Sequence, residues 1–554
     1  MADNPNSNKP GSSNAYRNKT CSKSANHNTP GSNNPSLRRF LSSRRDFLKK
    51  AGLLSGAGLI LPSASYSYIT GADRGASDQK PLDGKLPDID RNPSPGHIIR
   101  IRGRVTAGGR GIRGISITDG LRIIETGQDG EFELLSDDRR LFVYLSLPAG
   151  YRIPTNPTGT ARFYQKIEPD QNGEMRAVFE LETDPADRTR HAFLMLADPQ
   201  TENEYEVRRF HSETVPDIRK LIHDFGDGRP LFGIGGGDLM FDNLELFPEY
   251  EKAVHQMGVP FFQLIGNHDI TFRVRSAEDA YRVFQEYFGP THYSFDAGEI
   301  HYVILNNIFW YGTGYVGYLD QDQLDWLEAD LARIEKGRTV VVSMHIPALS
   351  TQHLRLGSNS PSPRLSLANR DALYHILEPY NVHLLTAHMH EHDHVFEGGL
   401  HEHIHGTVCG AWWTGPICFD GTPNGYGLYE ARGSELRWQY KATGYVADFQ
   451  IKLYKRGADP EKPGEILANV WDWDPEWSVF WYENGERRGQ MTRRTSLDPL
   501  AVELFDGPDK PERRTWINPV PTSHLFYAPL DENAGPVTVE AINRWGKTFT
   551  ARLA

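Results

Sequence analysis

The chain has 554 residues, of which 38% are hydrophobic and 24% are charged, and its formal net charge is −12 at pH 7. This length is too great for one ordinary core, so two to four domains are expected. The negative charge argues against a nucleic-acid-binding surface and weakly against adhesion to anionic membranes. It does not exclude an anionic substrate, because bound metal ions would invert the local field. The composition does not indicate whether the protein is a monomer or an oligomer.

Residues 1–68 are predicted to be a disordered leader that ends in an export signal. Residues 1–36 are rich in Asn, Ser, Gly and Pro and cannot bury enough apolar surface to order themselves. Arg44 and Arg45 precede an apolar run at 51–62, which is too short to span a bilayer and is typical of an export signal. The alternative is a basic linker before a buried helix.

The run Ser-Arg-Arg-x-Phe-Leu-Lys at residues 43–49 closely resembles a twin-arginine leader. This resemblance implies the twin-arginine export machinery as a partner and a periplasmic or extracellular location. It also implies that no transmembrane anchor is left after the signal is removed.

Residues 69–96 are predicted to be a linker rich in Gly, Asp and Pro, and residues 97–183 a small β-sandwich. Short alternating strands, separated by Gly-Gly and Asp-Gly turns, are expected at 98–105, 114–118, 121–125, 131–134 and 141–147. The runs Gly-Ile-Arg-Gly-Ile and Gln-Asp-Gly-Glu-Phe in this region resemble the transthyretin-like modules that precede many secreted enzymes.

Strands and helices alternate from residue 190 to residue 431. Apolar strands are expected at 192–197, 231–234, 260–265, 301–305, 339–343 and 382–385. Ser276 and Asp279 open one helix as a capping box, and residues 320–336 form another.

From residue 434 to residue 554 the pattern returns to β-type alternation. Asn484-Gly485 is a strong hairpin turn between two of these strands. This region is predicted to be a second β-rich domain.

Five apolar strands of the central region end in a potential metal ligand. The residues at those ends are Asp198 with Gln200, Asp238, Asn267 with His268 and Asp269, His345, and His388 with His390. Ligands of open α/β sheets bind beyond the carboxyl ends of the strands, so these side chains are expected to converge. Each residue alone could be a helix cap, a turn or a surface side chain, but chance convergence of the whole set is the weaker hypothesis.

The ordered motifs resemble the calcineurin-like metallophosphoesterase superfamily over about 240 residues. Two positions depart from the family pattern, since Gln200 replaces a histidine and Ala387 replaces a glycine. The three-part layout, with the segments 409–416 and 421–426, resembles a bacterial exported subfamily. The resemblance implies a multidomain protein whose central α/β metallophosphoesterase β-sandwich is flanked by helices, with an N-terminal transthyretin-like β-sandwich and a C-terminal β-rich domain.

The same resemblance implies a centre of two divalent or trivalent metal ions, drawn from Fe, Mn and Zn. One ion is assigned to Asp198, His390 and Gln200, the other to Asn267, His345 and His388, and Asp238 bridges them. The expected reaction is hydrolysis of a small phosphomonoester or phosphodiester substrate by a metal-bridged hydroxide.

His268 is expected to be the general acid, or a donor to the phosphoryl oxygens, in this reaction. A carboxylate is needed to fix which nitrogen of the His268 ring carries the proton. Asp242 is the candidate for this role, and Asp269 is the alternative. Trp413 and Tyr426 are predicted to contact the substrate. Trp412 and Trp413 could equally pack between domains, with one tryptophan in each role.

Two further alternatives stay open at this point. The histidines at 392, 394, 401, 403 and 405 could form a third metal site, but the favoured interpretation is alternate strand residues that face solvent or each other. The protein could also be a catalytically weak or inactive surface- or carbohydrate-binding protein on the same scaffold. Gln200 is the only support for that function, and the intact Asn267-His268 pair argues against it.

Overall fold

A computed structural model describes residues 97–186, 189–226, 228–508 and 510–553. The leader, twin-arginine motif and linker predicted for residues 1–96 lie outside the described residues. Within the described ranges, no helix combines the length and the apolar character needed to cross a membrane.

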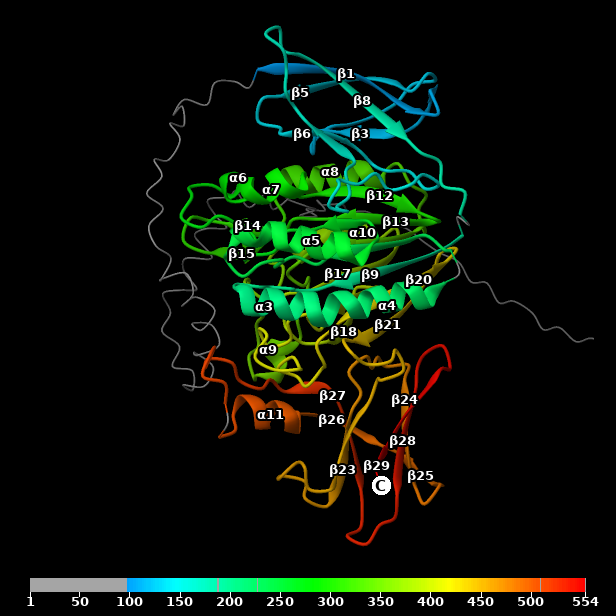
Figure 1. Cartoon of the computed structure of the whole chain (residues 1–554), viewed down its shortest axis with the longest axis vertical. Coiled ribbons are helices and arrows are strands. Elements are labelled where there is room, and N and C mark those ends of the chain that lie inside the picture. Colours follow the sequence, from blue (N-terminus) through cyan, green and yellow to red (C-terminus); the bar gives the residue numbers. More distant parts are fainter. Residues whose placement is uncertain (1–96, 187–188, 227, 509, 554) are drawn as a thin grey trace, which may run out of the picture. The chain divides into compact units, whose positions relative to one another are not determined.

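Two four-stranded sheets with a common core form the N-terminal part of the described chain (Figure 1). Their strands are β1 (Ile98–Ala107), β2 (Arg110–Gly111), β3 (Ser116–Thr118), β4 (Ile123–Glu125), β5 (Glu131–Asp137), β6 (Phe142–Leu145), β7 (Tyr164–Lys166) and β8 (Glu174–Leu181). One sheet has the order β2-β1-β5 with β8 also paired to β1, and the other has the order β4-β3-β6-β7. Alternate residues of β5, such as Phe132 and Leu134, are buried, so each sheet turns one face to the core. The likeness to transthyretin stays a prediction.

The central part contains two larger sheets that face each other. The five-stranded sheet has the order β11-β10-β9-β20-β21, and the six-stranded sheet has the order β12-β13-β16-β17-β19-β18. The strands are β9 (Arg190–Leu196), β10 (Leu231–Gly235), β11 (Phe261–Gln263), β12 (Tyr293–Ala297), β13 (Ile300–Ile304), β16 (Thr339–Ser343), β17 (Asn381–Thr386), β18 (Asp393–Glu397), β19 (Leu400–Ile404), β20 (Gly425–Arg432) and β21 (Glu435–Ala442). A separate hairpin joins β14 (Ile308–Trp310) and β15 (Tyr315–Gly317). Strands of the parallel core, such as β16, are buried throughout because both of their faces are covered.

Helices cover the outer faces of both central sheets (Figure 1). They are α3 (Glu204–Arg209), the π-helical turn η2 (Phe210–Thr214), α4 (Val215–Phe225), η3 (Leu244–Leu246), α5 (Phe247–Met257), α6 (Ala277–Ala280), α7 (Arg282–Phe288), α8 (Gln321–Leu331), α9 (Gln352–Arg355) and α10 (Arg370–Leu377). Helices α4 and α5 share a core with β9, whereas α8 and α10 share one with β16 and β17. The inner faces meet through rings such as Phe193 and Tyr302, whose centroids are 5.4 Å apart. The α/β sandwich flanked by helices is therefore confirmed.

The central sheet continues further along the chain than predicted. The strand expected to begin the C-terminal domain is β21, which pairs along its whole length with β20. Strand β20 in turn pairs antiparallel with β9. Residues 433–434, where the two domains were predicted to divide, are only the turn of this hairpin, so the central unit extends to Ala442.

Two four-stranded sheets with a shared apolar core form the C-terminal part. Their elements are β22 (Lys452–Tyr454), β23 (Glu465–Asn469), β24 (Ser478–Glu483), β25 (Glu486–Gln490), β26 (Thr492–Ser496), α11 (Pro499–Phe505), β27 (Thr522–Pro529), β28 (Val537–Ile542) and β29 (Thr548–Leu553). Asn484 and Gly485 have φ values of 52° and 81°, which the two-residue turn between β24 and β25 requires.

A histidine buried between two carboxylates should make the stability of the fold depend on pH. His301 Nε2 lies 3.0 Å from Asp330 Oδ2, and its Nδ1 lies 2.9 Å from Asp296 Oδ1. Burial opposes its charge, but the two carboxylates outweigh burial and raise the pKa of His301 to about 9. Since this folded pKa exceeds the unfolded value of about 6.5, the charged histidine stabilises the fold fully below pH ~6.5. That stabilisation, at most about 3 kcal/mol, is lost as the pH rises through about 9.

Urea unfolding at about pH 6 and about pH 9.5 measures this effect in the wild type and in His301→Gln. We expect the free energy of unfolding to fall less between the two pH values in the variant. An equal fall in both proteins would show that another group carries the pH dependence.

Candidate metal centre

The structure brings all seven predicted ligand residues together at the carboxyl ends of strands from both central sheets. Asp198 and Gln200 follow β9, Asp238 follows β10 and Asn267 follows β11, whereas His345 follows β16 and both His388 and His390 follow β17. Parallel strands end at the same edge of a sheet, and the two sheets face each other, so residues far apart in sequence converge.

Asp238 lies at the middle of this ligand group. Its Oδ2 is 3.0 Å from Gln200 Nε2 and 3.3 Å from His345 Nε2. The ligand atoms of Asp238, His345 and His388 all lie within 4.8 Å of one another. Further contacts join His345 Nε2 to Asn267 Oδ1 at 3.2 Å, His390 Nε2 to Asp198 Oδ1 at 3.6 Å and the His388 backbone nitrogen to Asp198 Oδ2 at 3.0 Å.

Backbone strain is concentrated in the same place. Eleven non-glycine residues of the described chain have a positive φ. Eight of them belong to this group or lie close to it: Asp198, Gln200, Asp238, Asp242, His388, His390, Trp412 and Trp413. Each such residue costs free energy, so the surrounding structure must hold these side chains in position. Gly266 is needed for a related reason, because a Cβ there would lie 2.0 Å from the backbone nitrogen of Asp238.

The outward-facing nitrogen of each ligand histidine is bonded to a backbone carbonyl. His345 Nδ1 donates to Gly236 O at 2.9 Å, His388 Nε2 to Arg364 O at 3.0 Å and His390 Nδ1 to Gly410 O at 2.6 Å. These bonds fix the tautomers and leave the other nitrogen of each ring as a lone-pair donor.

The unpartnered oxygen and the shifted pKa values in this group are consistent with a site for metal ions. Asp198 is fully buried, and its Oδ1 has no hydrogen-bond partner among the described residues. Burial raises the pKa of Asp198 to about 8, with the neighbouring Asp238 adding to the rise. Burial also lowers the pKa of His390 to about 3, so that ring is neutral and able to bind a metal. A cation would satisfy the unpartnered oxygen and remove the repulsion between the two carboxylates.

His268 stands beside the ligand group and is paired with Asp242. Its Nδ1 lies 2.6 Å from Asp242 Oδ1, and its backbone nitrogen donates to Asp238 Oδ1 at 2.8 Å. The alternative partner, Asp269, is used elsewhere, because its two oxygens accept the backbone N–H groups of Met240 and Gly266. Asp242 therefore orients the ring, and Asp269 braces the loop.

The two aromatic residues predicted to contact the substrate are instead buried in the helix-covered core. Trp413 is 3% exposed and donates through Nε1 to Pro199 O, and Tyr426 is fully buried with its hydroxyl donating to Asp217. The ring next to the ligands belongs to Trp412, which stacks on His390 with centroids 3.9 Å apart. Adjacent residues in left-handed backbone point in directions that the sequence does not reveal, so the sequence could not decide which tryptophan lies beside the ligand residues.

Two residues beside the site were not identified from the sequence. Phe241 stacks on the His268 ring at 4.4 Å, and Arg514 from the C-terminal part lies 4.4 Å above Phe241. No motif identifies Arg514, because it reaches the site only through the packing of a distant segment.

Arg514 and Arg513 offer a matched pair of substitutions. Both contact Glu202 and the buried Glu206, but the Arg514 side chain is 6% exposed and that of Arg513 is 48% exposed. Arg514→Met should lower the free energy of unfolding by about 3 kcal/mol, since it removes a buried partner of a buried carboxylate. Arg513→Met should cost less than about 1 kcal/mol. Urea denaturation of both variants tests this, and equal losses would contradict it.

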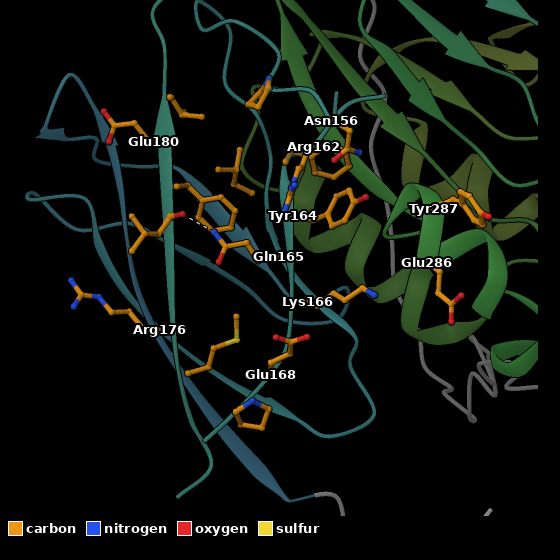
Figure 2. Close-up of a pocket in the computed structure, with 18 of the residues that line it drawn as sticks. Asn156, Arg162, Tyr164, Gln165, Lys166, Glu168, Arg176, Glu180, Glu286 and Tyr287 are labelled. Carbon is orange, nitrogen blue, oxygen red and sulfur yellow. Dashed lines mark hydrogen bonds between the residues drawn. The ribbon is translucent and has the colours of Figure 1, made fainter. Parts of the chain in front are cut away.

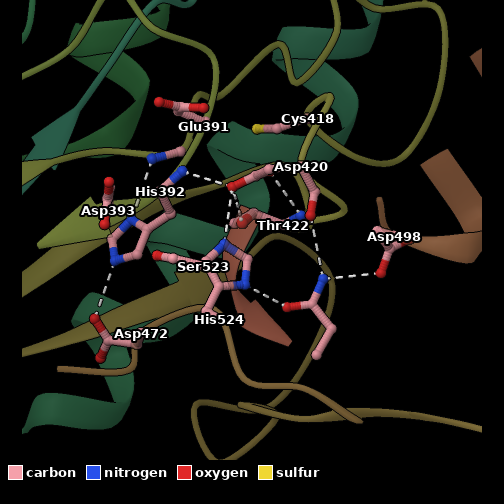
Figure 3. A network of polar contacts seen from close by, with 12 residues as sticks. Glu391, His392, Asp393, Cys418, Asp420, Thr422, Asp472, Asp498, Ser523 and His524 are labelled. Atoms are coloured by element: carbon pink, nitrogen blue, oxygen red, sulfur yellow. Dashed lines mark hydrogen bonds and ion pairs between the residues drawn. The ribbon is translucent and has the colours of Figure 1, made fainter. Parts of the chain in front are cut away.

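A buried polar network connects the segment after His390 to the C-terminal sheets (Figure 3). The backbone nitrogen of His392 donates to Asp420 Oδ2 at 2.8 Å, and His524 Nε2 lies 3.1 Å from the same oxygen. His524 Nδ1 in turn bonds to Asn469 of β23 at 2.7 Å. The C-terminal part therefore braces the ligand loop directly. Cys409 and Cys418 in this region are both free thiols.

A cavity of about 1190 Å³ lies away from the ligand group, between β7, β8 and α7 (Figure 2). The residues that line it and are labelled in Figure 2 include the basic Lys166 and Arg176 and the acidic Glu168, Glu180 and Glu286. None of the predicted ligands is among the described residues that line it.

Two family models match the chain. The model described as "N terminal of Calcineurin-like phosphoesterase" matches residues 99–184, and "C terminal of Calcineurin-like phosphoesterase" matches residues 402–549. The chain is also similar to two proteins of Arabidopsis thaliana. Purple acid phosphatase 13 is 32% identical over 105 residues, covering 17% of this chain and 18% of that protein. Purple acid phosphatase 15 is 30% identical over 182 residues, covering 26% and 32%.

The chain thus spans less than a third of the length of these curated relatives. Among solved structures, purple acid phosphatase PPD1 from yellow lupin seeds is 13% identical, with 60% of this chain and 67% of that chain covered and a TM-score of 0.35. PhoD is 9% identical, with 69% and 85% covered and a TM-score of 0.33. These two family models match residues 99–184 and 402–549, so the chain carries the N- and C-terminal domains that accompany calcineurin-like phosphoesterases.

Proposed function

We propose that this protein is a metal-dependent hydrolase of phosphate esters with a centre of two metal ions. The observation that carries the proposal is the convergence of Asp, Gln, Asn and His side chains from five strand ends around Asp238. The matches to the N- and C-terminal family models of calcineurin-like phosphoesterases support it. The substrate class is a small phosphomonoester or phosphodiester.

Asp198, Gln200 and His390 would hold one ion, and Asn267, His345 and His388 the other. Asp238 would bridge them, which its contacts with Gln200 on one side and His345 on the other support. Mixed oxygen and nitrogen donors suit Fe, Mn or Zn. Two such ions would supply charge neutralisation of the phosphoryl group and a water molecule of lowered pKa at neutral pH.

His268 would give its Nε2 proton to the leaving-group oxygen, or hydrogen-bond to the phosphoryl group. Asp242 accepts at Nδ1, so the Nε2 position faces away from the carboxylate and stays available for the substrate. Stacking on Phe241 holds the plane of the ring. Trp412 would form part of the wall of the site, since it covers His390.

Metal analysis combined with ester hydrolysis tests the proposal. The full chain should hold two equivalents of metal at this centre and hydrolyse p-nitrophenyl phosphate or bis(p-nitrophenyl) phosphate, and chelation should abolish turnover. The ratio of the two rates assigns the substrate class. A chain that retains its metal but hydrolyses neither ester would favour the non-catalytic binding function instead.

We also propose that the protein is exported, on the strength of the Ser-Arg-Arg-x-Phe-Leu-Lys run. Replacing Arg44 and Arg45 by lysine should retain the protein in the cytoplasm of an expressing bacterium. Cell fractionation followed by immunoblotting measures this, and unchanged export of the double variant would remove the twin-arginine route.

A further inference from the structure

Three histidines outside the candidate metal centre form a second group of nitrogen ligands. They are His383 on β17 and both His401 and His403 on β19, and one ligand nitrogen of each lies within 4.8 Å of the other two. Strand geometry brings them together, because His383 pairs with His401 in the parallel register and residues 401 and 403 share one face of β19. His383 Nδ1 lies 3.0 Å from His403 Nε2.

The group lies between the two central sheets and can be reached from outside. Trp438 of β21 packs against it, with ring centroids 4.6 Å from His403 and 4.9 Å from His401. A cavity of about 560 Å³ opens onto His383 and His401, and Trp438, Arg544 and Trp545 form part of its wall. The interpretation favoured from the sequence was that these histidines face solvent or each other, and in the structure His401 and His403 are buried and face each other.

The hydrogen bonds of the group are incomplete. Among the described residues, the buried His403 Nδ1 has no hydrogen-bond partner. Burial lowers the pKa of all three rings, to about 4 for His383. The imidazoles are therefore neutral and present lone pairs to a common space.

A neighbouring carboxylate sets the tautomer of His401. His394 Nε2 lies 3.1 Å from Asp472 Oδ1, and its Nδ1 lies 3.1 Å from His401 Nε2. Although burial opposes its charge, hydrogen bonds from His392 and His394 keep the pKa of Asp472 below its usual value, so it accepts and His394 Nε2 carries the proton. With the proton of His394 on Nε2, its Nδ1 can accept from His401 Nε2, which leaves His401 Nδ1 unprotonated. Metal-binding histidines are commonly oriented by such a carboxylate chain.

We propose that His383, His401 and His403 bind one divalent transition-metal ion of the zinc class, separate from the two-metal centre. Three imidazoles form the ligand set of zinc sites that keep a further position open, and the absence of oxygen ligands disfavours Mg²⁺ and Ca²⁺. Arg544, held by Asp474 at 2.8 Å, adds positive charge to the cavity wall, which favours an anion as the additional ligand.

The adjacent group of His392, His394 and Asp472 is explained without a metal ion. Gly406 N donates to His392 Nδ1 at 3.2 Å, so the proton of that ring is on Nε2, facing Asp472 Oδ1 at 3.1 Å. Each of these contacts is a complete hydrogen bond.

Zinc stoichiometry of the full chain tests the proposal. The chain is stripped with a chelator, reloaded with Zn²⁺, desalted and analysed for metal as wild type, His383→Gln, His401→Gln and the exposed control His375→Gln. Both site variants should hold one equivalent less than the wild type and the control. The same difference is expected on a His388→Ala background, so the result does not depend on the proposed two-metal centre. Equal zinc content in all four proteins would overturn the proposal.

A second measurement needs no substitution and so avoids any effect on folding. Zn²⁺ should slow the modification of His383 by diethyl pyrocarbonate at least about tenfold, as followed by peptide mass spectrometry, while the modification of His375 stays unchanged. An unchanged rate at His383 with saturating Zn²⁺ would likewise overturn the proposal.

Discussion

Replacing Asp238 by asparagine is expected to lower kcat for phosphate-ester hydrolysis by at least about 10³-fold, more than the 10–100-fold typical of a residue that only supports a ligand. Asp238 is 1% exposed and contacts both halves of the ligand group, so in the proposed centre its charge would hold two ions at once. Asparagine has the same shape but offers one oxygen and no charge. Metal analysis should show the loss of at least one equivalent together with the loss of turnover.

The exposed Asp224→Asn variant on α4 is the control, because it changes the net charge equally at a distant surface. Circular dichroism should report the same fold for both variants. An Asp238→Asn protein that keeps both its metal content and its kcat would show that the centre is assembled differently.

Replacing His268 by alanine should lower kcat by about 10²- to 10⁴-fold for esters with a poor leaving group while the metal content is retained. Phenyl phosphate and p-nitrophenyl phosphate separate the two possible roles of the ring. A general acid matters most when the leaving group is a poor one, so the loss should be clearly larger for the phenyl ester. Equal losses with both esters would identify His268 as a donor to the phosphoryl oxygens.

Asp242→Asn should reproduce this pattern at a smaller scale, about 10- to 100-fold, because it disturbs only the orientation of the His268 ring. The exposed His223→Ala variant on α4 is the matched control and should hydrolyse both esters at the wild-type rate. An Asp242→Asn protein with unchanged kinetics would show that Phe241 alone positions the ring.

The ligand group was predictable because each ligand ends a strand whose apolar run is visible in the sequence. Strands buried on both faces give continuous hydrophobic stretches, and a polar residue directly after such a stretch stands out. The same rule placed β9, β10, β13, β16 and β17 close to their observed ranges.

The walls of the site were not predictable from these patterns. Trp412 and Trp413 are neighbours of one type, and only the left-handed backbone at both positions decides which ring covers His390. Arg514 reaches Phe241 by tertiary packing, which leaves no periodic signal. The role of β21 was missed because the same alternating pattern is expected of a strand in the central sheet and of a strand in a separate β-rich domain.

The pairing of β9 with β20 has a consequence during synthesis of the chain on the ribosome. Strand β9 acquires its β10 neighbour early, but its other edge stays open until residues 425–432 have left the ribosome. At usual rates of synthesis this interval lasts some 10 to 50 s. During that time the free edge of the apolar strand β9, which leads into the ligand residue Asp198, can pair with other chains. Slow translation between the two strands should therefore increase aggregation of the newly made protein, whereas slowing it after residue 442 should not.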